Sequence, residues 1–266
     1  MTRVLLLDIG NSATKWLSLD SRTEVTEGRI ETTKIVDALK PQLKDATVLV
    51  SSVAAPALQN SLSADLATLC RQICFAQSRS SVNDLVNSYA DPERMGVDRW
   101  LAMLGARRRV AGRICVVDAG SALTIDLVAE DGRHEGGYII PGVALMERAL
   151  FADTDRVRDS LPSGASIAPG CSTAEAVSHG LLLAQAGAVS LSLSHAAASG
   201  EAPEVLMCGG GADDLAQVLD VEVTIAPRLV LEGLLLQAQI ECADLLDYPA
   251  LWKAYHDAFE VSRSPR

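Results

Sequence analysis

"VLLLDIGNSATKW", residues 4–16, and "ICVVDAGSALTID", residues 114–126, are two versions of one pattern. Each has a run of apolar residues, then an aspartate, one further residue, a glycine and a small polar cluster. A near-continuous Val/Leu run is typical of a strand that is covered on both faces. Each stretch therefore predicts a buried strand that ends in a carboxylate and a glycine turn, with a second strand returning after the turn.

The order of the other elements repeats more loosely, which indicates an internal duplication. In the first half we expect strands at residues 3–9, 14–19 and 24–31, a helix at 33–39 that Pro41 ends, a strand at 46–54 and a helix at 55–72. In the second half we expect strands at 113–120, 121–130 and 134–142, helices from about 143 and at 173–195, a strand at 204–211 and a helix at 227–246. The predicted division is a lobe at residues 1–113, a lobe at 114–246 and a tail at 247–266 without an assigned role.

Composition excludes several classes of protein. The 266 residues are 48% hydrophobic and 21% charged, as in a soluble globular protein. A net charge of −11 argues against a nucleic-acid partner, because such proteins usually carry basic patches. We expect no membrane helix, no signal peptide and no membrane partner, and hence a cytoplasmic protein. The six cysteines are scattered without paired short spacings, which predicts ordinary thiols in a reducing compartment.

The first loop has the chemistry of a phosphate cradle. Gly10 permits a tight turn and a close approach of the backbone to a ligand. Asn11, Ser12 and the loop amides offer hydrogen-bond donors, and Lys15 offers a mobile positive charge. Asp8, at the carboxyl end of a strand, is placed to hold a hydrated Mg²⁺. A simple hairpin turn is the alternative, because Asp-x-Gly also occurs there.

The second loop repeats the carboxylate, the glycine and the hydroxyls in Asp118, Gly120, Ser121 and Thr124. Two such loops, one from each lobe, are suited to bind one phosphate chain and its cations. The glycine strings at 136–137 and 209–211 add places where backbone can approach a ligand.

Four motifs in order resemble one family. They are DIGNSATK at 8–15, GVDRW at 96–100, DAGSALT at 118–124 and GCSTAEAV at 170–177. With them, the chain to about residue 246 resembles the type III pantothenate kinases, members of the acetate and sugar kinase, heat-shock ATPase and actin superfamily. The resemblance implies an α/β fold of two ribonuclease H-like lobes related by duplication, with mixed sheets flanked by helices and a nucleotide cleft between the lobes.

The resemblance also implies an activity: ATP-dependent phosphorylation of pantothenate to 4'-phosphopantothenate, the first step of coenzyme A biosynthesis. The implied cofactors are ATP with Mg²⁺ and a monovalent cation, potassium or ammonium, and the implied assembly is a homodimer. The implied ATP contacts are Asp8, Ile9, Gly10, Asn11, Ser12, Ala13, Thr14, Lys15 and Ser121, with Asp8 near Mg²⁺ and Asp118 holding the monovalent cation. The implied pantothenate contacts are Tyr89, Gly96, Val97, Asp98, Arg99 and Thr173, with Asp98 as the catalytic base.

The chemistry of the GVDRW block fits these roles. The hydroxyl that is phosphorylated needs a proton acceptor, Asp98 can supply one, and Gly96 leaves room beside it. Arg99 can bind the substrate carboxylate with its planar fork. The structural alternative is a helix start, with Asp98 as a cap and Arg99 in solvent. The structural alternatives for the other contacts are a packing role for Tyr89 and a cap of the following helix for Thr173. We expect Arg107–Arg109 to be a solvated helix face and not a nucleic-acid patch.

Two other functions stay open from the sequence. One is a sugar kinase or phosphatase on the same two-lobed scaffold, because fold does not fix function. The other is a non-catalytic transcription accessory factor of the same family. One residue departs from the family pattern: Ser121 stands where the second loop usually has threonine, so the hydroxyl is kept and a methyl group is lost.

Overall fold

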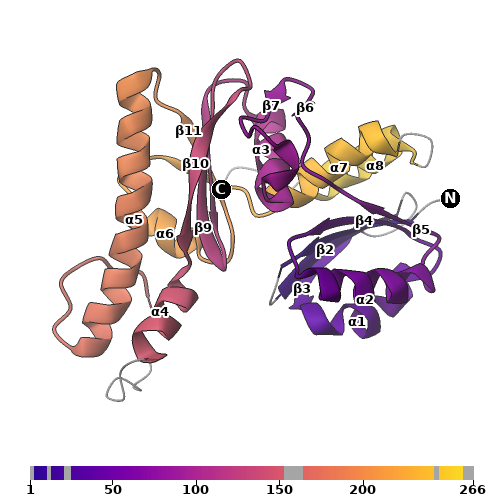
Figure 1. Cartoon of the computed structure of the whole chain (residues 1–266), viewed down its shortest axis with the longest axis horizontal. Helices are drawn as coiled ribbons and strands as arrows, with labels where there is room; N and C mark the ends of the chain where they lie inside the picture. Colours follow the sequence, from indigo (N-terminus) through magenta and orange to yellow (C-terminus); the bar gives the residue numbers. More distant parts are fainter. Residues whose placement is uncertain (1–2, 11–12, 21–24, 153–163, 243–245, 260–266) are drawn as a thin grey trace. The chain divides into compact units, whose positions relative to one another are not determined.

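The structure is a computed structural model that describes residues 3–10, 13–20, 25–152, 164–242 and 246–259. The chain forms two compact units, and each is assembled from separate stretches. The first unit contains Met1–Val82, Tyr89–Gly105 and Val230–Arg266, and the second contains Asn83–Ser88 and Ala106–Leu229. Each unit is built around one five-stranded sheet (Figure 1).

The first sheet has the strand order β3-β2-β1-β4-β5. β1, β2 and β3 form an antiparallel meander, and β4 and β5 run parallel to β1. A near-continuous apolar run from Val4 to Leu7 explains why β1 is buried on both sides. The strands are β1 (Arg3–Ile9), β2 (Ala13–Asp20), β3 (Thr26–Glu31), β4 (Thr47–Ser52) and β5 (Gln72–Phe75).

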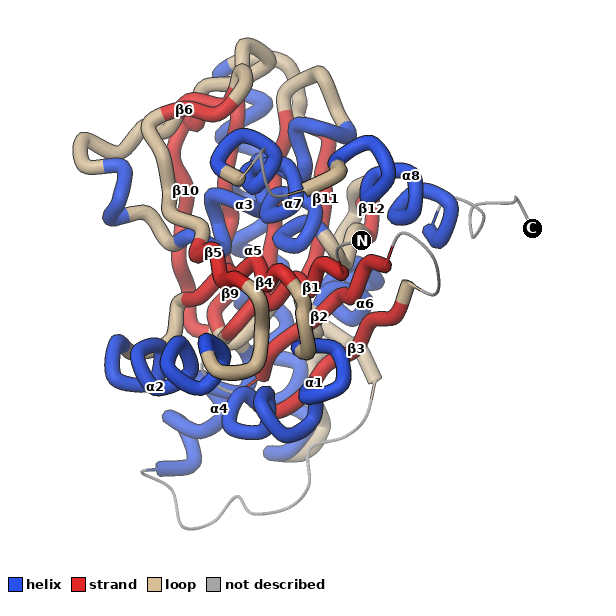
Figure 2. The backbone as a smooth tube through the Cα atoms, turned by 90° about the vertical axis from the view of Figure 1, so that its right-hand side faces the viewer, coloured by secondary structure: helices blue, strands red, loops and turns tan. Residues whose placement is uncertain are grey.

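Helices cover both faces of this sheet. α1 (Ile35–Leu43), entered through the 3₁₀ turn η1 (Thr32–Lys34), and α2 (Pro56–Ala67) lie side by side on one face (Figure 2). Their apolar residues pack on Leu5, Leu7 and Ile9 of β1. On the other face, residues of α7 (Leu229–Glu241) lie beside Leu49 of β4, and α8 (Tyr248–Phe259) contacts β2.

The second sheet has the order β10-β9-β8-β11-β12, which is the order of the first sheet repeated. Its first three strands are again antiparallel, and its last two again run parallel to the first strand. The strands are β8 (Ile114–Ala119), β9 (Ala122–Val128), β10 (His134–Pro141), β11 (Glu204–Cys208) and β12 (Val223–Ile225). The same topology and directions in both sheets support the predicted duplication.

The described residues of the second unit also form the helices α4 (Val143–Ala152), α5 (Thr173–Ser199) and α6 (Ala212–Val218). α5 and α6 pack on one face of the sheet through residues such as Leu182, Val189 and Leu215 (Figure 1). Among the described helices, α5 alone is long and apolar enough to cross a membrane, a property that the sequence analysis did not anticipate. Its buried residues pack on the sheet, and 28% of its apolar window is buried.

The segment before the GVDRW block is irregular. It contains the short strands β6 (Ser81–Val82) and β7 (Leu85–Val86) and the 3₁₀ turn η2 (Pro92–Arg94). The block itself opens α3 (Val97–Arg109), so the GVDRW motif is a helix start.

Several predicted details are corrected by the structure. Pro41 does not end the first helix: α1 continues to Leu43, whose complete burial holds the last turn in place. Arg107 is not solvated, because its side chain is only 6% exposed and is paired with Asp84. The compact units also divide the chain differently from a boundary at 113, because α7 and most of the predicted tail, as α8, belong to the first unit.

Candidate active site

The first loop sets Asp8 among polar partners at the end of β1. Leu5, Leu7 and Ile9 face α1 and α2, so Asp8, which alternates with them, points to the opposite side of the sheet. Lys15 of β2 and Ser51 of β4 are its direct partners on either side. Directly paired residues point to the same face, and the Ser51 hydroxyl donates a 3.1 Å hydrogen bond to Asp8 Oδ1. A half-buried carboxylate and a lysine therefore share one surface.

Buried hydroxyl groups hold the turn itself. The Thr32 hydroxyl donates to the Gly10 carbonyl oxygen at 2.8 Å, and Thr14 Oγ1 lies 3.1 Å from Thr32 Oγ1. Since the one proton of Thr32 goes to Gly10, Thr14 is the donor in this pair. Both Thr14 and Ile9 are buried, so their side chains support the loop from within. The predicted ATP contacts Asn11 and Ser12 lie outside the described residues.

The second loop lies at the same place in its sheet as the first, and close-packed glycines fix its conformation. Asp118 again lies one residue before the end of its strand, directly opposite Thr124 of β9 and Cys208 of β11. Gly209 has a φ of +98°, and a Cβ there would lie 2.5 Å from Asp118 Oδ1. A Cβ on Gly142 would lie 2.6 Å from the Ser121 carbonyl oxygen. Only glycine fits at these two positions.

The GVDRW block places Asp98 in the first turn of α3. Asp98 Oδ1 accepts a 2.8 Å hydrogen bond from the Arg99 backbone N–H, and the half-buried carboxylate gains from the positive end of the helix. A Cβ on Gly96 would lie 2.6 Å from the same oxygen, which confirms that Gly96 leaves room for Asp98. The helix-start interpretation is thus correct as local structure, and it is compatible with a catalytic carboxylate.

Arg99 and Tyr89 form one unit. Arg99 is only 6% exposed, so it is not the solvated residue of the structural alternative. Its Nη1 donates to the Tyr89 hydroxyl oxygen at 2.9 Å, and its guanidinium carbon lies 5.8 Å from the centre of the Tyr89 ring. This cation–π distance favours one fixed arrangement. Two predicted pantothenate contacts that are ten positions apart in the sequence therefore touch.

Thr173 is the first residue of α5 and is exposed. The cap is Ser172, not Thr173, because Ser172 Oγ accepts the Glu175 N–H at 3.2 Å. Glu175 Oε2 in turn accepts the Cys171 N–H at 2.7 Å, an arrangement close to a capping box. The Thr173 hydroxyl is therefore left for another role.

The units contain the predicted residues in two sets. The first unit holds the first loop, Tyr89 and the start of α3, whereas the second unit holds Asp118, Ser121 and Thr173.

The oxygen atoms at the two loops are suitable ligands for the implied cations. Among the described residues, no group of three or more His, Cys, Asp or Glu side chains could hold a metal ion. Mg²⁺ commonly takes one or two carboxylates and completes its shell with water and substrate phosphates, so the single carboxylate of Asp8 is sufficient. A monovalent cation is bound by oxygen atoms, backbone carbonyls included, and Asp118 beside the close-packed loop carbonyls is such a set.

A buried thiol, Cys115, lies near the beginning of β8. Burial, with a smaller contribution from the charge of Asp126, raises the pKa of Cys115 to about 12. All six cysteines are free thiols. A thiol with so high a pKa is protonated at neutral pH and is a poor nucleophile.

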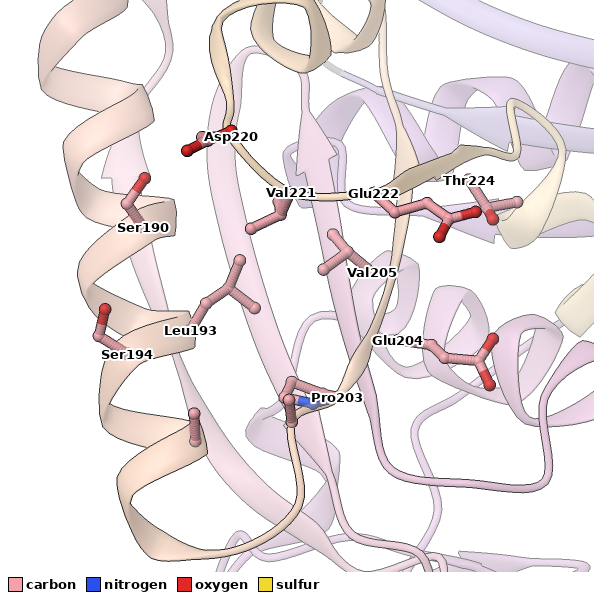
Figure 3. Close-up of a pocket in the computed structure, with 12 residues that line it drawn as sticks. Ser190, Leu193, Ser194, Pro203, Glu204, Val205, Asp220, Val221, Glu222 and Thr224 are labelled. Atoms are coloured by element: carbon pink, nitrogen blue, oxygen red, sulfur yellow. The ribbon is translucent and has the colours of Figure 1, made fainter.

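A cavity of about 730 Å³ in the second unit lies away from these residues (Figure 3). It is lined by Leu193 and two serines of α5, by Glu204 and Val205, and by the stretch from Asp220 to Thr224. Glu204 pairs with Ile114, at the beginning of β8, whereas Asp118 is near its end. Ligands of α/β sheets bind at the carboxyl ends of strands, so this cavity is not the candidate site.

Some residues of the site were not predicted. Ser51, Thr32 and Gly142 carry no motif, and only their contacts with Asp8, Gly10 and Ser121 reveal them. Gly209 was singled out as one of a glycine string. Gly209 packs on Asp118. A run of glycines in the sequence does not indicate which residue it will contact.

Fold and site together define the class. Two sheets of equal topology, each with a carboxylate and a glycine turn at the end of its first strand, are typical of the two-lobed α/β fold of sugar kinases and actin-like ATPases. Solved structures share this fold. A protein from Campylobacter jejuni assigned to the Baf family of transcriptional activators is 21% identical, with a TM-score of 0.57 over 91% of this chain and all of its own. A protein from Sinorhizobium meliloti assigned as a 2-dehydro-3-deoxygalactonokinase is 16% identical, with a TM-score of 0.51 over 90% of this chain and 99% of its own.

The sequence comparisons then give the family. Residues 4–194 match the family model described as type III pantothenate kinase. The type III pantothenate kinase of Thiobacillus denitrificans is 36% identical over 86% of this chain and 94% of its own length. That of Halorhodospira halophila is 36% identical over 87% and 96%. The chain belongs to the type III pantothenate kinase family, and it is a kinase enzyme.

Proposed function

We propose that this enzyme transfers the γ-phosphoryl group of ATP to pantothenate and forms 4'-phosphopantothenate, the first step of coenzyme A biosynthesis. The observation that carries the proposal is the family match over residues 4–194, which includes all four motifs. The activator assignment of the Campylobacter jejuni protein does not support a regulatory role here, because at 21% identity the likeness shows the fold alone.

Asp98 is the proposed general base. The pantothenate hydroxyl loses its proton as the phosphoryl group arrives, and a positioned carboxylate accepts it. The backbone N–H of Arg99 orients Asp98 through Oδ1. The start of α3 favours the ionised form of the carboxylate, which is the form that accepts a proton.

The remaining substrate contacts are assigned to the residues next to Asp98 and to Thr173 of the second unit. Arg99 supplies positive charge for the pantothenate carboxylate, and Tyr89 holds the guanidinium in place. Gly96 and Val97 supply backbone at the helix start, and Thr173 supplies an exposed hydroxyl.

ATP is assigned to residues 8–15 and to Ser121. Lys15, on the face of Asp8, suits a phosphate oxygen. Asp8 would hold Mg²⁺, which when bound neutralises charge on the transferred phosphoryl group. Asp118 would hold potassium or ammonium.

The same proposal includes a homodimer. The exposed positions of α5 from Gly180 to Ala198 include no charged residue, and Leu183 and Leu191 there are 51% and 58% exposed. An uncharged helix face with two exposed leucines supports association with a second copy. Leu191→Glu should give a monomer in light scattering, whereas Asn60→Glu on α2 should not. A monomeric wild-type protein would refute this part.

A cytoplasmic location is also proposed. All six cysteines are free, which supports a reducing compartment. Fractionation of cells that express the full chain tests this directly, and recovery with the membrane pellet contradicts it.

The central experiment is a coupled kinase assay with pantothenate, MgATP and potassium or ammonium. Asp98→Asn keeps the shape of the side chain but removes the proton acceptor, so kcat should fall by about 10²–10⁴-fold. Asp91→Asn, an exposed carboxylate in the segment before the block, is the matched control and should keep its turnover. Absence of phosphopantothenate with the wild-type enzyme would refute the proposed function, and normal kcat in a folded Asp98→Asn variant would refute the base assignment.

A further inference from the structure

A second polar network in this protein takes no part in the site described above. Ser88 Oγ lies 2.8 Å from His134 Nδ1, and His134 Nε2 lies 3.0 Å from Asp126 Oδ1. His134 and Asp126 are 3% and 1% exposed, whereas Ser88 is exposed. All three belong to the second unit.

The direction of the hydrogen bonds follows from the carboxylate. In the neutral imidazole, the Nε2 proton donates to Asp126, and Nδ1 presents a lone pair. With this tautomer, the Ser88 hydroxyl donates to Nδ1. Burying a carboxylate and an imidazole between two strands costs free energy unless their polar atoms are hydrogen-bonded. Ser88 provides the hydrogen-bond partner of the second imidazole nitrogen.

The local structure of β9 and β10 sets the directions of the Asp126 and His134 side chains. Leu123 and Ile125 of β9 face the α5 and α6 layer, so Asp126 points to the opposite side. A register shift between His134 and Gly136 interrupts the β9–β10 ladder next to the histidine. Bulges of this kind redirect a side chain.

Ser88 is the last residue of a short segment that is anchored to the second unit. At its beginning, Asp84 pairs with Arg107, whose Nε lies 3.2 Å from Asp84 Oδ2. In its middle, the Val86 N–H donates to the Gly132 carbonyl oxygen at 3.0 Å. A Cβ on Gly132 would lie 2.1 Å from the Asp84 carbonyl oxygen, so the segment packs directly on the β9–β10 turn. The Ser88 hydrogen bond fixes its end.

The next residue is Tyr89, where the chain joins the first unit. We propose that Asp126, His134 and Ser88 are positioning residues that fix the backbone immediately before Tyr89, and through it the Tyr89–Arg99 pair that receives pantothenate. This inference rests on the proposed function, because it assigns its effect to pantothenate binding. Loss of the network should leave the ATP loops unaffected.

Ser88→Ala removes the donor, and Ser88→Thr keeps it. Ser88→Ala should raise the KM for pantothenate about tenfold, with the KM for ATP and kcat within about twofold, since one hydrogen bond to a buried group is worth about 1–1.5 kcal/mol. Ser88→Thr should restore most of the loss. Ser80→Ala, an exposed serine of the same region, is the matched control and should behave as wild type.

Hydrogen exchange gives a readout that does not depend on activity. The backbone amides around residues 86–90 should exchange faster in Ser88→Ala than in wild type or Ser80→Ala, at an unchanged melting temperature. Faster exchange with an unchanged pantothenate KM would overturn the inference, because the network would then only stabilise the segment. Equal rises in the KM for ATP and for pantothenate would overturn it as well.

The same order of groups activates serine nucleophiles in acyl transfer. Covalent labelling of Ser88 by a fluorophosphonate would therefore overturn the positioning role. Turnover of the wild-type enzyme separates the two proposals: without it the proposed function fails, whereas normal wild-type turnover with a normal pantothenate KM in Ser88→Ala refutes the positioning role alone.

Discussion

The two aspartate–glycine loops occupy the same place in their sheets and differ in what holds them. The first is braced by hydroxyl groups, with Ser51 on Asp8 and Thr14 and Thr32 below Gly10. The second is braced by close backbone contacts at Gly142 and Gly209. Opposite the carboxylate, Lys15 in the first loop corresponds to a threonine in the second. A duplicated fold can therefore keep the position of the loop and place the positive charge in one copy only.

The strongest test of this difference removes the charge of the first carboxylate. Asp8→Asn should lower kcat by about 10²–10³-fold, or about 3–4 kcal/mol of barrier, as for loss of a charge-stabilising group. The Mg²⁺ concentration needed for half-maximal activity should rise. Asp37→Asn, an exposed carboxylate of α1, is the control. An unchanged kcat and an unchanged Mg²⁺ dependence in Asp8→Asn would show that Asp8 does not hold Mg²⁺.

Next in size is the effect of a side chain in the glycine-braced loop. Gly209→Ala should lower the free energy of unfolding by about 1–3 kcal/mol or more, because alanine is strained at positive φ and its Cβ meets the Ala119 backbone. In Gly211→Ala, the added Cβ would be 3.4 Å from the Ala119 oxygen, so this variant should be stable. Urea denaturation measures both, and equal stabilities would contradict the packing argument.

A smaller effect is expected from the second carboxylate. Asp118→Asn should raise the half-activating concentration of potassium or ammonium about tenfold, which is about 1.4 kcal/mol. Asp131→Asn, in the β9–β10 turn, serves as the control. The assignment is wrong if the wild type is fully active in sodium-only buffer, or if Asp118→Asn is activated normally.

The smallest effect should come from Ser121→Thr. The variant keeps the hydroxyl and adds a methyl that restricts χ1, so kcat/KM should stay within about twofold or rise slightly. Ser121→Ala, which lacks the hydroxyl, should lose more. A large loss of turnover in folded Ser121→Thr would mean that the second loop has no space for the methyl.

Local patterns in the sequence were sufficient for most elements of both sheets. The apolar runs that precede Asp8 and Asp118 predicted β1 and β8. The helix start at GVDRW was left as an alternative, and α8 was missed because the tail carried no assigned motif. Pro41 was misread, because burial of Leu43 maintains a helix turn that propensity alone would end.

The sequence by itself determined that two buried strands end in a carboxylate and a glycine turn, and that four motifs occur in the order of one kinase family. These features depend only on residues that are close in the sequence, so they can be recognised without the structure. Only the tertiary structure decided that Lys15 and Ser51 flank Asp8, that Gly209 packs on Asp118, and that Ser88 meets His134. The physical reason is that strand register and side-chain contacts between distant residues are set by the packing of the whole core, which local pattern does not encode.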